Sequence, residues 1–223
     1  PGAAGNAACN LAALGAKTFM VGVVGEDMNA DVVRREFALR NVDASGLVVD
    51  PNRPTNTYGK LRAGGHNIPV QEILRTDTPK PTFISGDVEA QVLANIRAFA
   101  PKVNAIVVGD QASSVATERV LAEVVAVAKK HNLLTVGDSR ARAGALKGFD
   151  IIVPNDREAG LGAGVDVVDD ASLREAGKKL LGICKNALVT CGPAGITIFA
   201  ENGTVENVPI IPCNVVDVTG AGD

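Results

Sequence analysis

The last seven residues of the chain carry the clearest pattern for chemistry. They follow an apolar, strand-like run and read Asp217-Val218-Thr219-Gly220-Ala221-Gly222-Asp223. Successive backbone N–H groups with little side-chain cover, here those of Gly220, Ala221 and Gly222, form a nest that binds an anion. Asp223 at the edge of this nest could accept a proton from a hydroxyl that attacks a bound phosphate. An ordinary glycine-rich turn with a capping Asp is the structural alternative.

A second stretch of small residues opens the chain, at Pro1-Gly2-Ala3-Ala4-Gly5-Asn6-Ala7-Ala8. Small residues at Gly2 and Ala3 let a polyhydroxy ligand approach the backbone, and the Asn6 amide can both donate to and accept from its hydroxyls. The G-x-G-x-x-G spacing of a dinucleotide-binding turn is absent. Close helix packing with Asn6 as a cap is the structural alternative.

Two further stretches follow strand-like runs in the second half of the chain. If a helix begins at Asn155, Glu158 lies one turn into it, and its carboxylate can face the cleft at the end of the preceding strand. Mg²⁺ in phosphoryl-transfer sites takes such carboxylate oxygen, usually through water. A capping box fits the same spacing. The next strand closes with Thr190-Cys191-Gly192-Pro193-Ala194-Gly195, whose glycines either admit a nucleotide or make a turn.

Short apolar runs alternate with helical patterns along the chain. The strands and helices that these patterns predict must position the four stretches. The runs predict buried parallel strands at Lys17–Val24, Asn104–Val108, Leu133–Val136, Asp150–Val153 and Ala187–Thr190. Apolar residues at helical spacing predict helices at Asn6–Leu14, Asn29–Leu39, Val88–Phe99, Ala116–Lys130 and Ala171–Ile183. Ile196–Phe199 and Val205–Ile211 are typical of an antiparallel pair near the sheet edge. We expect a doubly wound, mostly parallel α/β sheet.

One stretch breaks this alternation. Thr55–Asp77 contains two extended runs around Gly64-Gly65 and is flanked by prolines, which predicts a β-hairpin. We therefore expect an α/β core formed by residues 1–53 and 78–223, with a lid inserted at residues 54–77. Inserts of this kind commonly act as lids or dimer surfaces.

Composition excludes several classes of protein. The length of 223 residues fits one domain. A net charge of −3 with scattered Lys and Arg argues against a nucleic-acid partner, and no apolar run approaches the roughly 20 residues of a membrane span. The four cysteines form neither a disulfide framework nor a zinc pattern, so we expect a reduced, cytoplasmic setting. Because the chain begins at Pro1 without a Met, we expect it to be a fragment.

The four stretches, in this order, resemble the ribokinase-like (PfkB) sugar kinases. The family's first pattern is matched at Gly2, Asn6, Ala8, Gly15 and Gly25, and its second at Asp217–Asp223. Its N-x-x-E motif is matched at Asn155 and Glu158, and its nucleotide-side T-x-G turn at Thr190, Gly192 and Gly195. Two independent patterns about 200 residues apart, in a matching α/β frame, make coincidence very improbable.

Within this family the chain looks most like the D-glycero-β-D-manno-heptose 7-phosphate kinases, which form the kinase half of ADP-heptose synthase proteins. The likeness is carried by Gly2–Gly15, Lys60–Arg62, Ile73–Asp77 and Val216–Asp223. Three departures stand out. Those kinases read S-D-Y-x-K-G where this chain has Gly109-Asp110-Gln111-Ala112-Ser113-Ser114, D-P-K where it has Asp138-Ser139-Arg140, and Gly where it has Ala3.

The resemblance implies ATP-dependent phosphorylation of a hydroxyl on a small-molecule sugar or sugar phosphate. The sugar would contact Gly2, Ala3, Asn6 and Asp110 beneath the hairpin. MgATP would lie over Asn155, Thr190, Gly192 and Gly195, with Glu158 holding Mg²⁺ and a monovalent cation as a further cofactor. Asp223 would be the base, and the N–H groups of Gly220, Ala221 and Gly222 would hold developing charge. It also implies a homodimer through the lid, a strand before Pro1 and helices after Asp223.

Other functions stay open at this stage. Inside the kinase class the acceptor could be ribose, fructose, a fructose phosphate, a nucleoside or a deoxyketo-acid. A non-catalytic sugar- or nucleotide-binding protein would share the fold. A nicotinamide-dependent oxidoreductase would share the α/β alternation, but the glycine pattern and its acidic ribose partner are absent.

Overall fold

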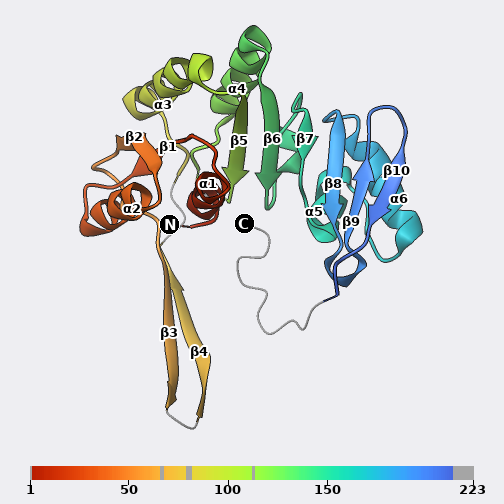
Figure 1. Ribbon diagram of the computed structural model, residues 1–223, viewed down its shortest axis with the longest axis horizontal. Coiled ribbons are helices and arrows are strands. Elements are labelled where there is room, and N and C mark those ends of the chain that lie inside the picture. The colour runs from red at the N-terminus through yellow and green to blue at the C-terminus, as the bar shows by residue number, and fades with distance from the viewer. Residues whose placement is uncertain (1, 66–67, 79–81, 112–113, 213–223) are drawn as a thin grey trace.

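Parallel strands and covering helices alternate along the computed structural model (Figure 1), which describes residues 2–65, 68–78, 82–111 and 114–212. The helices are α1 (Ala3–Ala13), α2 (Met28–Leu39), α3 (Gly86–Phe99), α4 (Glu118–His131), α5 (Asp156–Ala163) and α6 (Asp170–Leu180). The strands are β1 (Thr18–Val24), β2 (Val42–Val49), β3 (Tyr58–Gly65), β4 (Ile68–Asp77), β5 (Ala105–Asp110), β6 (Leu134–Ser139), β7 (Ile151–Ile152), β8 (Asn186–Thr190), β9 (Ile196–Phe199) and β10 (Val205–Val208). Short 3₁₀ turns lie at Ala100–Lys102, Ala143–Ala145 and Gly192–Ala194.

The main sheet has the strand order β10-β9-β8-β7-β6-β5. Strands β5 to β8 are parallel, while β9 and β10 turn back as an antiparallel edge. β1 and β2 pair in parallel as a separate two-stranded sheet. The predicted mostly parallel sheet with an antiparallel edge is therefore confirmed. Because β5, β6, β7 and β8 run the same way, their carboxyl ends share one edge, which faces the hairpin in Figure 1.

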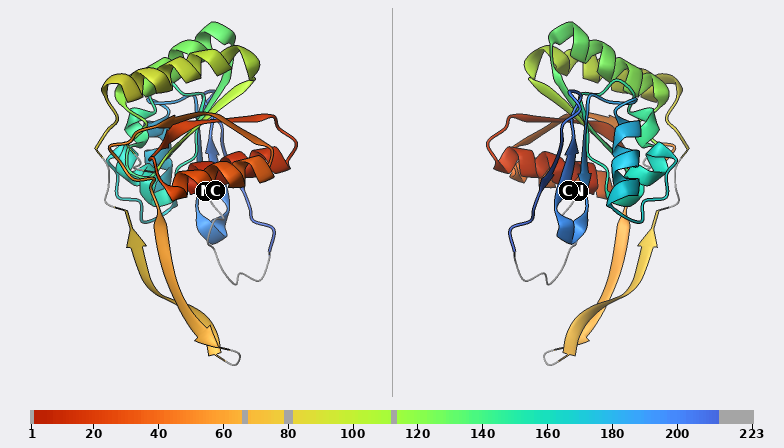
Figure 2. Two further views of the ribbon diagram at one scale, coloured as in Figure 1. Left: turned by 90° about the vertical axis from the view of Figure 1, so that its left-hand side faces the viewer. Right: turned by 90° about the vertical axis from the view of Figure 1, so that its right-hand side faces the viewer.

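Helices cover two faces of this arrangement, as a doubly wound fold requires. Figure 2 shows β1 and β2 between α1 and α2 on one side and α3 on the other. The larger core packs Phe149, Ile152 and Phe199 of the strand region against α3, α4 and α6, and a smaller core gathers Ala8, Cys9, Phe37 and Val42. Every predicted helix is present, with its ends shifted by up to three residues.

Strand β2 was not predicted from the sequence. Its residues, VDASGLVV, include polar and small side chains, and the apolar run at their end is only three residues long. Val42 and Val48 are nevertheless buried, and a Cβ atom at Gly46 would lie 2.6 Å from the carbonyl oxygen of Met20 and 2.8 Å from the Phe99 ring. Packing against β1 and α3 therefore forms this strand, and a glycine is needed where the layers approach closely.

The hairpin of β3 and β4 projects from the carboxyl edge with its side chains exposed (Figure 1). Its foot is closed by paired bonds, because the Thr57 N–H donates to Thr78 Oγ1 over 2.6 Å and the Thr78 N–H donates to the Thr57 carbonyl over 3.0 Å. The predicted hairpin is confirmed, and its role as a lid stays a prediction. No helix in the described ranges has the length and apolarity needed to cross a membrane.

Candidate active site

Asp110 is the last residue of β5, the terminal strand of the main sheet, and lies at its carboxyl edge. Its side chain is 3% exposed, and its Oδ2 atom accepts hydrogen bonds from Ser139 Oγ over 2.9 Å and from Arg142 Nη2 over 2.7 Å. Its Oδ1 atom is the only buried side-chain nitrogen or oxygen in the described residues that has no partner. A buried carboxylate oxygen without a donor costs free energy. Asp110 therefore has one open acceptor that a ligand hydroxyl would satisfy.

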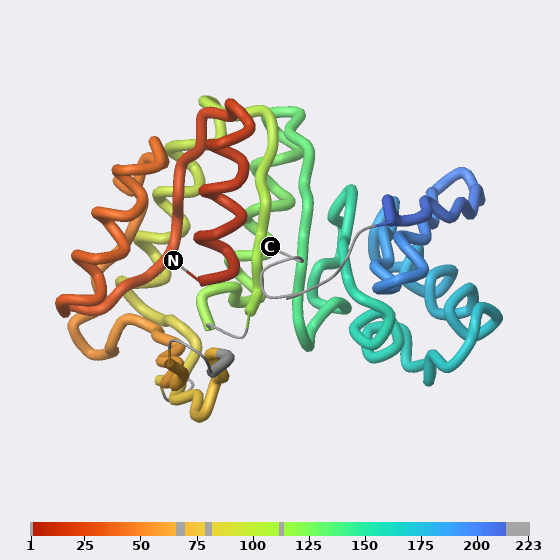
Figure 3. Tube along the Cα trace, turned by 60° about the horizontal axis from the view of Figure 1, so that its bottom comes forward, coloured from red at the N-terminus to blue at the C-terminus, as the bar shows by residue number. Residues whose placement is uncertain are grey.

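The start of α1 lies beside this carboxylate. Figure 3 shows α1 alongside β5, and a Cβ atom at Gly109 would lie 3.2 Å from the Cβ of Ala4. Gly2 precedes α1 with a φ of +83°, a backbone conformation that favours glycine, and its carbonyl accepts the Asn6 N–H over 2.7 Å. The structure thus brings the small-residue opening and Asp110 together, as the sequence predicts.

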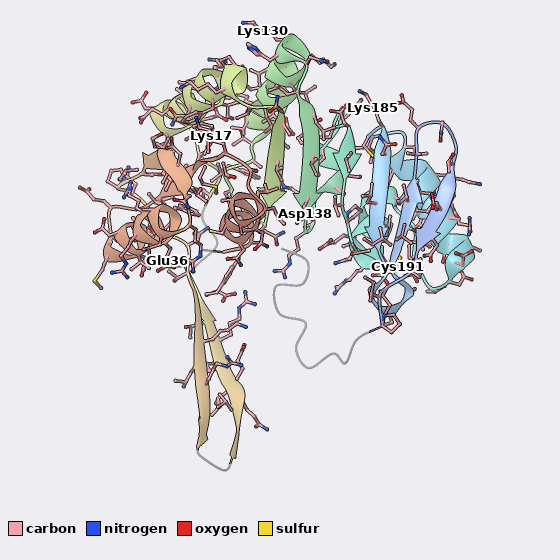
Figure 4. All side chains as sticks on the ribbon, in the orientation of Figure 1. Lys17, Glu36, Lys130, Asp138, Lys185 and Cys191 are labelled. Carbon is pink, nitrogen blue, oxygen red and sulfur yellow. The ribbon has the colours of Figure 1, made fainter. Side chains whose placement is uncertain are left out.

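Asp138 joins the same edge, although the sequence analysis gave it no role. It lies near the end of β6, which Figure 4 shows beside the ends of β5 and β7, and its Oδ2 atom accepts from Gln111 Nε2 over 2.7 Å. Burial raises its pKa from 3.8 to about 6, helped by the charges of Glu158 and Asp110 and opposed by the Gln111 bond. An Asp at the carboxyl end of a predicted parallel strand was the signal that could have identified it.

Glu158 takes part in a capping box at the start of α5. Asn155 Oδ1 accepts the Glu158 N–H over 2.8 Å, and Glu158 Oε2 accepts the Asn155 N–H over 2.9 Å. The structural alternative for this spacing is therefore confirmed. It occupies only one carboxylate oxygen, and no other hydrogen bond to Glu158 occurs among the described residues. The second oxygen is compatible with a cation ligand.

The carboxylates at this edge fit a hydrated divalent cation better than a fully protein-bound one. Within the ranges that the structure describes, no three His, Cys, Asp or Glu side chains converge closely enough to ligate a metal ion by themselves. Glu158 and Asp110 nevertheless raise the pKa of Asp138, so negative charge accumulates there. Mg²⁺ commonly keeps several waters and takes one or two carboxylates, which matches this donor set.

The predicted nucleotide-side residues also lie together. Asn155 forms an isolated parallel bridge with Thr190, and the Thr190 N–H donates to the carbonyl of Pro154 over 2.9 Å. Gly192 and Gly195 in the following turn have φ values of +52° and +89°. A Cβ atom at Gly195 would lie 2.1 Å from the carbonyl oxygen of Val208, so only glycine fits there. In Figure 4, Cys191 marks this turn at the same edge of the sheet as Asp138.

The predicted catalytic residues Gly220, Ala221, Gly222 and Asp223 lie outside the described residues, so their roles stay predictions.

The described part of the edge has two sides. Asp110 with the start of α1 forms one, and Asn155 with the turn from Thr190 to Gly195 forms the other, with Asp138 and Glu158 contributing carboxylates at the ends of the intervening elements.

A protein-family model described as pfkB family carbohydrate kinase matches residues 1–223. The chain belongs to this family. It is 35% identical over 225 residues to the bifunctional protein HldE of Geobacter sulfurreducens and 31% identical over 225 residues to that of Bradyrhizobium diazoefficiens. In each case the match covers 100% of this chain and 45% of the relative. The pfkB chain therefore spans about half the length of the curated relatives that it matches.

Solved structures support the same fold. Arabidopsis thaliana ribokinase, complexed with ribose and ATP, matches with a TM-score of 0.73 and 21% identity over 100% of this chain and 70% of its own. The tetrameric inhibited form of phosphofructokinase-2 from Escherichia coli matches with a TM-score of 0.75 and 15% identity over 99% of this chain and 71% of its own. The predicted ribokinase-like fold is confirmed. Membership of the pfkB family argues against the alternative of a nicotinamide-dependent oxidoreductase.

Proposed function

We propose that this pfkB protein transfers the γ-phosphoryl group of MgATP to D-glycero-β-D-manno-heptose 7-phosphate and forms the 1,7-bisphosphate. Family membership supports a sugar kinase, and both the resemblance to heptose kinases and the identity with HldE proteins support the heptose. The observation that carries the proposal is the open acceptor of Asp110, buried beside the start of α1 on the same edge as the Asn155 and Thr190 bridge.

The Asp110 side of the edge is suited to a sugar hydroxyl. Oδ1 can accept a hydrogen bond from a sugar hydroxyl. A hydrogen bond to a charged group contributes about 1.5–3 kcal/mol. Gly2 and Ala3 expose backbone at the start of α1, and Asn6 supplies an amide from the same helix. A phosphate would be repelled by the Asp110 carboxylate, whose Arg142 partner already contacts Oδ2. The hydroxyl end of the substrate therefore faces Asp110, and its phosphate lies away from it.

The other side of the edge is suited to MgATP. Asn155, Thr190, Gly192 and Gly195 would bound the nucleotide, and Glu158 with Asp138 would hold hydrated Mg²⁺. Bound Mg²⁺ neutralises charge on the phosphates. A monovalent cation is a further proposed cofactor, carried by the family resemblance alone.

The chain's own residues would perform the proton transfer. Asp223 takes the proton of the attacking hydroxyl, and the N–H groups of Gly220, Ala221 and Gly222 stabilise charge on the transferred group. The hairpin excludes water from the sugar, which limits hydrolysis of ATP when no sugar is bound. A high ATPase rate without sugar would contradict this role of the hairpin.

The hairpin also supports a homodimer. Leu61 lies opposite Leu74 in the register of β3 and β4, and Val70 and Ile73 lie on the same hairpin. Each of these four side chains is more than half exposed. An isolated two-stranded hairpin is at best marginally stable in water, so a second copy packed on these side chains would stabilise it. The free thiols of Cys9, Cys184 and Cys191 agree with the proposed reduced, cytoplasmic setting.

The proposal is tested by ADP release from MgATP with the intact protein, using heptose 7-phosphate, fructose 6-phosphate, ribose, fructose and adenosine as acceptors. We expect turnover with heptose 7-phosphate and none above background with the others. Turnover of another acceptor would replace the heptose and retain the kinase. Binding of ATP with no turnover on any acceptor would favour the non-catalytic alternative.

A further inference from the structure

Arg142 connects the Asp110 carboxylate to the chain segment that leaves the hairpin. Its Nη2 atom donates to Asp110 Oδ2 over 2.7 Å and to the carbonyl of Ala116 over 2.8 Å. The same guanidinium lies over the ring of Phe83, 4.9 Å from the ring centroid. Phe83 comes six residues after the end of β4 and is 52% exposed. One side chain therefore contacts both the open-acceptor carboxylate and the segment that leaves the hairpin.

Hydrogen bonds of the residues on each side of Phe83 hold it between the segment that enters the hairpin and the segment that follows β5. The Thr82 carbonyl accepts from Arg53 Nη2 over 2.9 Å, and Arg53 belongs to the segment that enters the hairpin. The Ile84 N–H donates to the Ser114 carbonyl over 3.0 Å, within the segment that follows β5. Phe83 also lines a hollow of about 420 Å³ at this foot, so its ring has room to shift.

The two donors on Oδ2 fix the rotation of the Asp110 carboxylate. Ser139 Oγ and Arg142 Nη2 both contact Oδ2, which leaves Oδ1 as the atom without a partner. The backbone N–H of Arg142 in turn donates to Ser139 Oγ over 3.0 Å, so the Ser139 hydroxyl is held in place beside Oδ2. Removing one partner of a buried ion pair leaves an uncompensated charge, and the carboxylate would then rotate or draw in water.

We propose that Arg142 is a positioning residue that presents Asp110 Oδ1 to the sugar and couples this carboxylate to the hairpin foot through Phe83. The inference rests on the proposed sugar kinase function, because the sugar is the ligand of Oδ1. When the foot moves, the Phe83 ring moves against the guanidinium that holds Oδ2. Since coupling between two sites is reciprocal, sugar on Oδ1 in turn favours one position of the hairpin.

The kinetic test uses Arg142→Gln and Phe83→Leu in the intact protein, with Arg97→Gln and Phe99→Leu as matched controls. With heptose 7-phosphate, Arg142→Gln should raise the sugar KM about tenfold or more, the loss expected for one hydrogen bond to a charged group. The KM for ATP should stay within about twofold. Phe83→Leu should raise the sugar KM by about 2- to 5-fold, the range of an exposed cation–π contact.

The double variant separates coupling from general damage. Because Phe83 acts through Arg142, Phe83→Leu should add nothing to the sugar KM of Arg142→Gln. The proposal would be overturned if the rise in sugar KM of the double variant equalled the product of the rises of the two single variants. Equal rises in the KM for sugar and in the KM for ATP would also overturn it. So would a control variant that reproduces the effect.

Hydrogen exchange of the sugar-free protein distinguishes failure of this inference from failure of the proposed function. Arg142→Gln and Phe83→Leu should each speed exchange of the Ile84 amide, and Arg97→Gln should not. If wild-type protein turns over no sugar, the proposed function fails, and the link between Arg142 and the hairpin foot is then judged by exchange alone. Unchanged exchange at Ile84 in both variants would overturn the link.

Discussion

Replacing Asp138 with Asn should stabilise the protein at pH 8 and leave its stability at pH 4 nearly unchanged. Asp138 has a pKa raised to about 6, chiefly by burial and then by the charge of Glu158. Because this folded-state value lies above the ordinary 3.8, the unfolded chain releases its proton at lower pH than the folded protein does. The contribution of the protonated Asp138 carboxyl to the free energy of unfolding is present in full below about pH 4. It is lost as the pH rises through 6.

The size of the effect follows from the shift and from solvent exposure. A shift from 3.8 to about 6 corresponds to about 3 kcal/mol at full strength. The Asp138 side chain is only about half buried, so screening reduces this to about 1 kcal/mol. For a chain of this length, 1 kcal/mol moves the melting temperature by about 2–4 °C. Asn retains an oxygen for the Gln111 amide, so the hydrogen bond is kept and only the charge is lost.

Thermal melts of wild type and Asp138→Asn between pH 4 and pH 8, without Mg²⁺, measure this difference. The exposed Asp166→Asn on the loop after α5 is the matched control and should show no pH-dependent gain. An equal effect of Asp138→Asn at both pH values would refute the reasoning, as would destabilisation at pH 8. Mg²⁺ should raise the melting temperature of wild type more than that of the variant, because the cation relieves the same repulsion.

Three further predictions concern the cation, the nucleotide turn and the hairpin. Glu158→Gln keeps a capping oxygen, so the melting temperature should not change. The Mg²⁺ concentration needed for activity should rise by a larger factor than the sugar KM. An unchanged Mg²⁺ titration would mean that Glu158 acts only as a helix cap. Gly195→Ala places a Cβ 2.1 Å from the Val208 carbonyl oxygen and should cost about 1–3 kcal/mol in a thermal melt and raise the KM for ATP. Gly144→Ala, whose Cβ meets nothing within 4 Å and whose φ is not positive, should do neither. Leu61→Glu should yield monomer in light scattering, whereas Leu39→Glu on α2 should not, and a dimer that survives Leu61→Glu would contradict assembly through the hairpin.

Local patterns predicted much of the architecture. Apolar runs such as that ending at Val24 and the amphipathic spacing of α4 report burial directly, because each needs only its own residues to show which face is covered. Strand β2 was missed because its polar and small residues become a strand only through packing against β1 and α3. β7 is shorter than predicted, at two residues, since the chain reaches Pro154 directly afterwards.

The site divides in the same way. The family motifs assigned Asp110, Asn155 and Thr190 to the site, because each motif carries its own spacing, whereas the bridge between Asn155 and Thr190 was not predicted. The role of Asp138 was missed because its raised pKa depends on burial in the folded chain and then on carboxylates from other elements. The contact of Arg142 with Phe83 joins residues 59 positions apart and exists only in the folded chain.

Phosphorus NMR of the intact protein with MgATP and heptose 7-phosphate tests the central claim most directly. We expect a new sugar-phosphate resonance to grow in step with ADP, and we expect Asp223→Asn to slow it by about 100-fold or more, the scale of lost general-base catalysis. ADP accompanied only by inorganic phosphate would contradict phosphoryl transfer to a sugar. Wild-type rates in Asp223→Asn would contradict the proposed base.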